Sequence, residues 1–116
     1  MKRLSKDDIL GVEDLSTEDV EVPEWGGMGT LRELKGSERD TFEENSLDKN
    51  RNVTMANMRA RLVALSAVDE DGKRMFSEKD AVKLGSKSAS ALNRLFGVAC
   101  RLSGITDDDV KDLEKN

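Results

Sequence analysis

Two stretches with apolar residues at helical spacing constrain the fold of this chain more than any other feature. The first, residues 87–103, carries its apolar side chains on one helical face: Leu92, Leu95, Phe96, Ala99 and Leu102. The second, residues 53–68, repeats the pattern with Met55, Met58, Leu62 and Leu65. Positions three and four residues apart form one stripe, which is buried against another element. We therefore expect two long helices to supply most of the core.

Shorter helices are predicted before and between these two. Ser37 is the expected N-cap of a helix that runs to about Asn45. Ser77 and Asp80 should cap another, which ends at Gly85 as a left-handed C-cap.

The end of the sequence predicts one more helix. Gly104 should close the helix of residues 87–103, so that Ile105 folds back onto it. Thr106 should then cap an acidic helix that carries Val110 and Leu113.

The first third of the chain reads differently. We expect residues 1–17 to be loosely ordered, with at most one helical turn opened by Ser5. Residues 20–22 alternate in polarity as a strand does, and Pro23 limits this strand to the edge of a sheet. The glycines of residues 26–29 predict a turn, which is followed by a returning strand at 31–34. The predicted fold class is a mainly α single domain of residues 1–116, with a short hairpin at 19–34 and a helical region at 37–113.

Composition excludes several classes of function. The 116 residues contain no histidine, no tyrosine and one cysteine, Cys100. Nucleophile systems and metal sites built on histidine are therefore ruled out, and we expect no catalytic residue, no metal and no cofactor. The net charge of −5 argues against nucleic acid as a partner, and no stretch is long and apolar enough to predict a membrane span.

Two local patterns leave other functions open. Asp69, Asp71 and Glu78 match part of a calcium-binding loop, although Ala67 stands where its first ligand belongs. Residues 77–96 have the spacing of a helix-turn-helix, which would make the protein a small DNA-binding regulator. The mixed charge around that segment favours two packed helices instead.

Four side chains are candidates for binding a protein partner. Trp25 and Met28 lie in the predicted hairpin, and Met55 and Met58 lie in the helix of residues 53–68. Methionine and tryptophan adapt to irregular apolar surfaces, so these residues are the predicted contact surface. Glu38, by contrast, is expected on the solvent-exposed surface without a structural role.

A series of short phrases in the sequence resembles one protein family. They are residues 20–27 (VEVPEWGG), 32–34 (REL), 36–42 (GSERDTF), 59–65, the turn 68–74 and the helix 92–102. In this order they resemble the tail assembly chaperones of long-tailed bacteriophages and prophages. The sequence departs from the resemblance at residues 28–30, where relatives show β-branched alternation.

The resemblance implies a protein that is not an enzyme and that acts in the cytoplasm of the infected bacterium. Such a chaperone would bind the tape measure protein, keep it soluble, help recruit tail tube protein and be absent from the mature virion. It would also allow a homo-oligomer. The alternative within phage biology is a minor structural tail protein.

Overall fold

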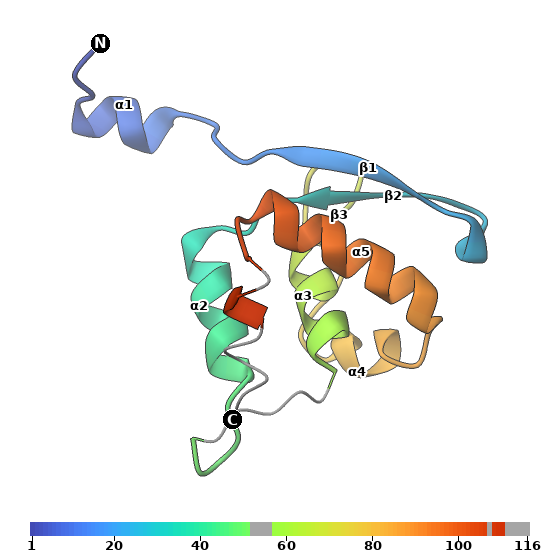
Figure 1. Ribbon diagram of the computed structural model, residues 1–116. Coiled ribbons are helices and arrows are strands. Elements are labelled where there is room, and N and C mark those ends of the chain that lie inside the picture. The colour runs from blue at the N-terminus through green and yellow to red at the C-terminus, as the bar shows by residue number, and fades with distance from the viewer. Residues whose placement is uncertain (52–56, 107, 111–116) are drawn as a thin grey trace.

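The fold was analysed in a computed structural model that describes residues 1–51, 57–106 and 108–110. The elements run in the order α1 (Lys6–Gly11), β1 (Thr17–Val22), the short 3-10 helix η1 (Pro23–Trp25), β2 (Gly27–Arg32), α2 (Gly36–Asn45), α3 (Met58–Ser66), β3 (Ala67–Val68), α4 (Asp80–Leu84) and α5 (Ala89–Leu102). Figure 1 shows α5 lying along the hairpin of β1 and β2, with α3 and α4 on its other side.

The sheet corrects the predicted fold class. It has three antiparallel strands in the order β1-β2-β3, so the described part of the chain is mixed α and β and not mainly α. Thr17 pairs with Arg32 and Val22 with Gly27 in the hairpin. The third strand pairs Ala67 with Leu31. It was missed because its two residues end an apolar run that also suits a buried helix.

The hairpin turns earlier than the sequence suggests. Pro23–Trp25 form the turn, and Gly26 closes it with a φ of +75°, a conformation that glycine adopts without steric cost. Gly27 and Gly29 therefore belong to β2 and not to a turn. Residues 28–30, where the sequence departs from the family resemblance, pair regularly with β1.

The two long helices were predicted from their apolar spacing, and α5 confirms its prediction closely. Ser88 caps it, since its Oγ accepts from the backbone N–H of Ala91 at 3.2 Å. Helix α3 is shorter than expected at its C-terminal end, because Ala67 and Val68 leave it to join the sheet. It is buried on nearly every side between α2, α4, α5 and β2, so it forms the centre of the core.

Two helix caps differ from the expected ones. Helix α2 begins at Gly36, and the Glu38 carboxylate accepts the backbone N–H of Lys35 at 2.8 Å, whereas Ser37 lies inside the helix. Gly85 follows α4 with a φ of −62°, so it is right-handed and not the expected left-handed C-cap.

The end of the chain follows its predicted course as far as it is described. Gly104 has a φ of +67°, the N–H of Ile105 donates to the Cys100 carbonyl at 2.9 Å, and Ile105 is buried. Thr106 and Asp109 exchange the hydrogen bonds of a capping box. Leu113, expected in this helix, lies outside the described residues.

Candidate partner-binding surface

The tip of the hairpin presents Trp25 at the protein surface. The N–H of Gly26 donates to the Pro23 carbonyl at 3.1 Å, which fixes the turn before the chain enters β2. The indole of Trp25 is 42% exposed, and Met28, three residues later, is 70% exposed. Large apolar side chains exposed this far often mark contact surfaces when they cluster.

These two side chains border an apolar groove of about 220 Å³. Its opposite border comes from Met75 and Phe76, which follow β3, and Met75 is 52% exposed. The floor is formed by core side chains of three elements: Leu31, Val63 and Leu95. We call this feature the hairpin groove. Its lining can bind apolar side chains, and it holds no pair of groups suited to acid and base chemistry.

The structure thus brings together two of the four predicted contact residues and adds a third. Met75 was not singled out from the sequence, where it lies in a short stretch rich in charged residues. A methionine beside Phe76 in that polar stretch was the available signal. Its place in the hairpin groove follows from the hydrogen bond of its N–H to the Ala67 carbonyl at 3.1 Å, which lays the segment against β3.

The other two predicted contact residues do not join the groove. Met58 is 2% exposed and belongs to the core, so its prediction as a surface contact is corrected. The physical reason is that Met58 shares the apolar stripe of Leu62 and Leu65, and the neighbours packed around α3 cover this stripe. Met55 lies outside the described residues.

Two bidentate ion pairs hold the hairpin on α5. The Arg94 guanidinium donates to both carboxylate oxygens of Glu24, at 2.7 and 2.9 Å, and Arg101 donates to both oxygens of Glu18, at 2.9 and 2.7 Å. The bonds from Arg94, with a backbone hydrogen bond, lower the pKa of the Glu24 carboxyl to about 2. The bonds from Arg101 likewise lower the pKa of Glu18. The pair of Glu24 and Arg94 holds the hairpin tip, and the pair of Glu18 and Arg101 holds the other end of the hairpin.

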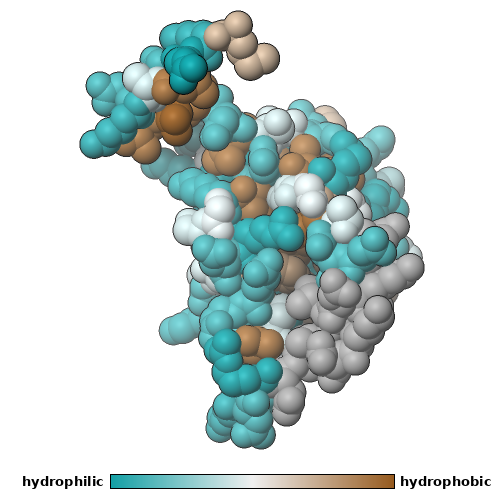
Figure 2. Space-filling model, turned by 60° about the vertical axis from the view of Figure 1, so that its left-hand side comes forward, coloured by the Kyte–Doolittle hydropathy of each residue, from teal (hydrophilic) through white to brown (hydrophobic). Residues whose placement is uncertain are grey.

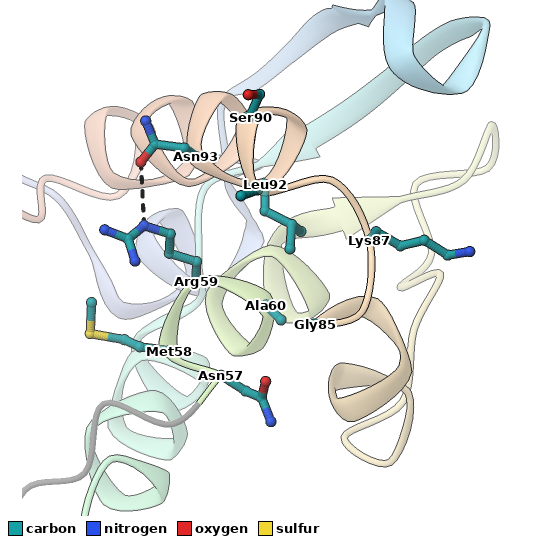
Figure 3. Close-up of a pocket in the computed structure, with 10 residues that line it drawn as sticks. Asn57, Met58, Arg59, Ala60, Gly85, Lys87, Ser90, Leu92 and Asn93 are labelled. Carbon is teal, nitrogen blue, oxygen red and sulfur yellow. Dashed lines mark hydrogen bonds between the residues drawn. The ribbon is translucent and has the colours of Figure 1, made fainter.

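A second, larger cleft of about 510 Å³ lies between the start of α3 and the start of α5. Figure 3 shows Arg59 and Lys87 extending to opposite sides of it. The Arg59 Nε donates to the Asn93 side chain at 3.3 Å, and the guanidinium lies 5.6 Å from the centre of the Phe96 ring. The polar groups therefore do not converge on one point, as a site for a small ligand requires.

The acidic turn at residues 69–73 has a structural explanation. The Asp69 carboxylate accepts the backbone N–H groups of Asp71 and Lys73, at 2.9 and 3.0 Å, and the Asp69 N–H donates to the Lys73 carbonyl. Aspartate commonly stabilises a turn in this way. Across the described residues, acidic and cysteine side chains form no group of three or more suited to a metal ion.

The expected recognition helix of a DNA-binding motif is occupied by internal packing. Helix α5 buries Leu92, Leu95 and Phe96, and Arg94 is bound to Glu24 of the hairpin. The charge of Arg94, the basic residue in the first half of α5, is therefore balanced within the chain.

The segment before the hairpin exposes a further apolar surface. Ser5 and Asp8 form a capping box that starts α1, so the segment contains more than the single helical turn expected. No residue of α1 is buried. Figure 2 shows apolar surface gathered on this projecting segment. Four of its apolar residues are each more than half exposed: Leu4, Ile9, Leu10 and Val12.

Comparison with known proteins identifies the family. The family model described as phage tail assembly chaperone matches residues 12–116. The chain belongs to the phage tail assembly chaperone family. This family is not known as one of enzymes. Comparison with curated proteins found no match.

A solved structure has the same fold as this member of the chaperone family. The tail assembly chaperone of bacteriophage HK97 superposes with a TM-score of 0.58 and 22% sequence identity, covering 76% of this chain and 85% of the HK97 chain. At this identity the likeness concerns the fold. Residues 1–11, with α1, precede the part that the family model matches. Among the described residues, no helix has both the length and the apolar character to cross a membrane.

Proposed function

We propose that this chaperone binds the tape measure protein of its phage, keeps it soluble and helps recruit tail tube protein during tail assembly. It would act in the cytoplasm of the bacterial host and would be absent from the mature virion. The observation that supports this proposal, beside the family, is the hairpin groove with its exposed border of Trp25, Met28 and Met75.

The physical case rests on covering apolar surface. A long helix without partners exposes an apolar stripe, and such stripes aggregate unless another surface covers them. The hairpin groove is apolar and open to solvent on one side. The chain as a whole carries a net charge of −5, which favours solubility of a complex in which many copies coat one partner. Each copy would then bind through the groove and present charge outward.

Coexpression with the cognate tape measure protein tests this function. We expect the parent protein to increase the soluble fraction of the tape measure protein and to copurify with it in many copies. The double variant Trp25→Ala with Met28→Ser removes the hairpin side of the groove, and both positions are exposed, so the fold should persist. Its expected effect is loss of copurification.

A matched control uses an exposed apolar residue away from the groove. Val82 on α4 is 67% exposed and does not line the groove, so Val82→Ser should solubilise the tape measure protein as well as the parent does. If the folded double variant still copurified, the groove would not be the contact surface. If the parent itself had no effect on the cognate partner, the proposed function would be wrong.

A further inference from the structure

Helix α1 lacks a packing partner in the described chain. It has six residues and buries none of them, whereas an isolated helix this short is unstable in water because nucleation is costly. Its capping box supports only the first turn. The four exposed apolar residues named above give it a surface that packing would cover. The segment of residues 1–12, which we call the arm, therefore has the properties of a docking element.

The arm stands away from the groove of its own chain. The groove runs along β2 from Gly27 to Leu31, with the exposed Met28 paired with Glu21 near the turn, and the arm leaves from the other end of the hairpin, before Thr17 (Figure 1). Thr17 and Glu21, the partner of Met28, are four residues apart in β1, a distance of roughly 13 Å at about 3.3 Å per residue. Residues 12–16 span at most about 17 Å when fully extended. Docking of Ile9 and Leu10 beside Met28 of the same chain would thus require residues 12–16 to reverse direction and run nearly extended back along β1.

Charge makes a second copy of the chain a suitable partner. Residues 1–11 contain three basic residues, Lys2, Arg3 and Lys6, and two acidic residues, Asp7 and Asp8, so their net charge is +1. Because the whole chain has a net charge of −5, the remaining residues have a net charge of −6. Strand β1, beside the groove, contributes Asp19 and Glu21 to that negative charge, whereas its Glu18 is paired with Arg101. The basic start of the arm is therefore complementary to the body of another copy.

We propose that the arm of one copy docks in the hairpin groove of a second copy, with Ile9 and Leu10 placed between Met28 and Met75. The exposed apolar side chains of both surfaces would be buried in this contact. It concerns the chaperone alone and needs no tape measure protein. The contact uses the groove that the proposed function assigns to the tape measure protein. The docked arm and the tape measure protein would therefore compete for the groove.

Disulfide trapping between two variants tests the contact. One protein carries Leu10→Cys and the other, distinguished by a mass tag, carries Met75→Cys; they are mixed with oxidised glutathione and analysed by mass spectrometry. We expect the 10–75 heterodimer to form in clear excess over either homodimer. A mixture with Val82→Cys in place of Met75→Cys is the control, since Val82 is also more than half exposed but lies outside the groove. Equal trapping at positions 75 and 82 would overturn the proposal.

The intrachain alternative has its own outcome. A protein with both Leu10→Cys and Met75→Cys would close its disulfide within one chain at high dilution if the arm folded back. Formation of that product, with no heterodimer in the mixed experiment, would also overturn the proposal. Neither result bears on whether the tape measure protein copurifies.

Sedimentation equilibrium gives a second measurement without cysteine variants. The parent protein should self-associate, and Leu10→Asp should weaken that association about tenfold or more, since a buried leucine is replaced by a charge. Leu10 is exposed in the single chain, so the circular dichroism spectrum should not change. Val82→Asp should associate like the parent. A parent protein that sediments only as a 12.8 kDa monomer would contradict the proposal.

Discussion

Two serine side chains, Ser66 in the core and the partly buried Ser103, join elements that are distant in the sequence. The Ser66 hydroxyl donates to the Arg32 carbonyl at 2.7 Å and links the end of α3 to β2. The Ser103 hydroxyl accepts the N–H of Leu34 at 2.9 Å, which ties the end of α5 to the segment after β2. Polar groups removed from water need such partners. Each of these bonds therefore fixes the position of an element as well as satisfying a polar atom.

Glu38 has a structural role that its sequence position does not indicate. Its side chain is only 11% exposed and accepts from the Arg32 guanidinium at 3.0 and 3.1 Å, as well as from the Lys35 N–H. The expectation of a solvent-exposed residue without such a role is thus wrong. Helix α2 is attached to the sheet through this carboxylate.

Replacement of Glu38 should therefore destabilise the protein. We expect Glu38→Ala to lower the free energy of unfolding by about 3 kcal/mol, because it leaves Arg32 largely buried without its carboxylate. Glu43 on the same helix pairs with Arg39 at an exposed position, so Glu43→Ala should cost less than about 1 kcal/mol. Urea unfolding of the two variants measures the difference, and equal effects would contradict the role of Glu38.

The central position of α3 leads to a prediction about the core. Leu62 is fully buried, and Leu62→Ala should cost roughly 2–5 kcal/mol through lost contacts and the cavity left behind. Val82→Ala, at an exposed position, should change the free energy of unfolding by less than about 0.5 kcal/mol. Thermal or urea unfolding gives both values. A Leu62→Ala protein as stable as the parent would mean that α3 is not the centre of the core.

At the scale of elements, the hairpin and α5 form one unit. The buried face of α5 packs against the sheet, and Arg94 and Arg101 bind carboxylates of η1 and β1 on the outside of that contact. Strand β1 is at the edge of the sheet, where unpaired backbone groups could pair with another copy. Its acidic residues oppose such pairing, because two copies would bring like charges together.

The contact between Glu24 and Arg94 should make hairpin attachment sensitive to acid. The pKa of Glu24 is lowered from 4.5 to about 2 in the folded protein. The charged carboxylate therefore contributes stability above pH 4.5, and that contribution is lost as the pH falls from 4.5 towards 2.

Glu24→Gln isolates this effect. The parent should be more stable than the variant at pH 7, and the difference should shrink progressively below pH 4.5. Urea unfolding at a series of pH values measures it. A difference that is constant between pH 7 and pH 2.5 would show that the ion pair is not the cause.

At the scale of the whole molecule, the structure consists of a packed body and an arm. The body is built from the sheet and the helices α2 to α5, with one continuous core, and these elements lie within the region matched by the family model. The arm contributes none of its side chains to that core. The surface that we assign to partner binding lies on the body, and the surface that we assign to self-association includes both parts.

Removal of residues 1–11 tests this division. At low protein concentration, the urea unfolding transition of the truncated protein should have the same midpoint and the same slope as that of the parent. The slope follows the surface area exposed on unfolding, and the arm buries none of its residues. Its self-association should be lost. A fall in the free energy of unfolding of more than about 1 kcal/mol would show that the arm packs on its own body.

The hairpin groove could be predicted only in part. Trp25 and Met28 were identified as candidates from residue type and from their place in a hairpin, and their role in binding is still a prediction. Met75 could not be joined to them, because the contact depends on the pairing of β3 with β2, about forty residues apart in the sequence. Met58 was counted both in the buried stripe and among the contact residues, and the packing of α3 decided that it belongs to the core.

The sequence by itself determined the features that depend on near neighbours. The helix of residues 87–103, the capping box at Ser5 and the left-handed Gly104 follow from periodicity and backbone conformation within a few residues. Tertiary structure decided the course of Ala67 and Val68, which suit a helix locally and a strand only when β2 supplies their hydrogen-bond partners. It also decided the burial of Met58 and Glu38. Burial and strand pairing depend on groups brought close by the whole fold, and local spacing carries no information about them.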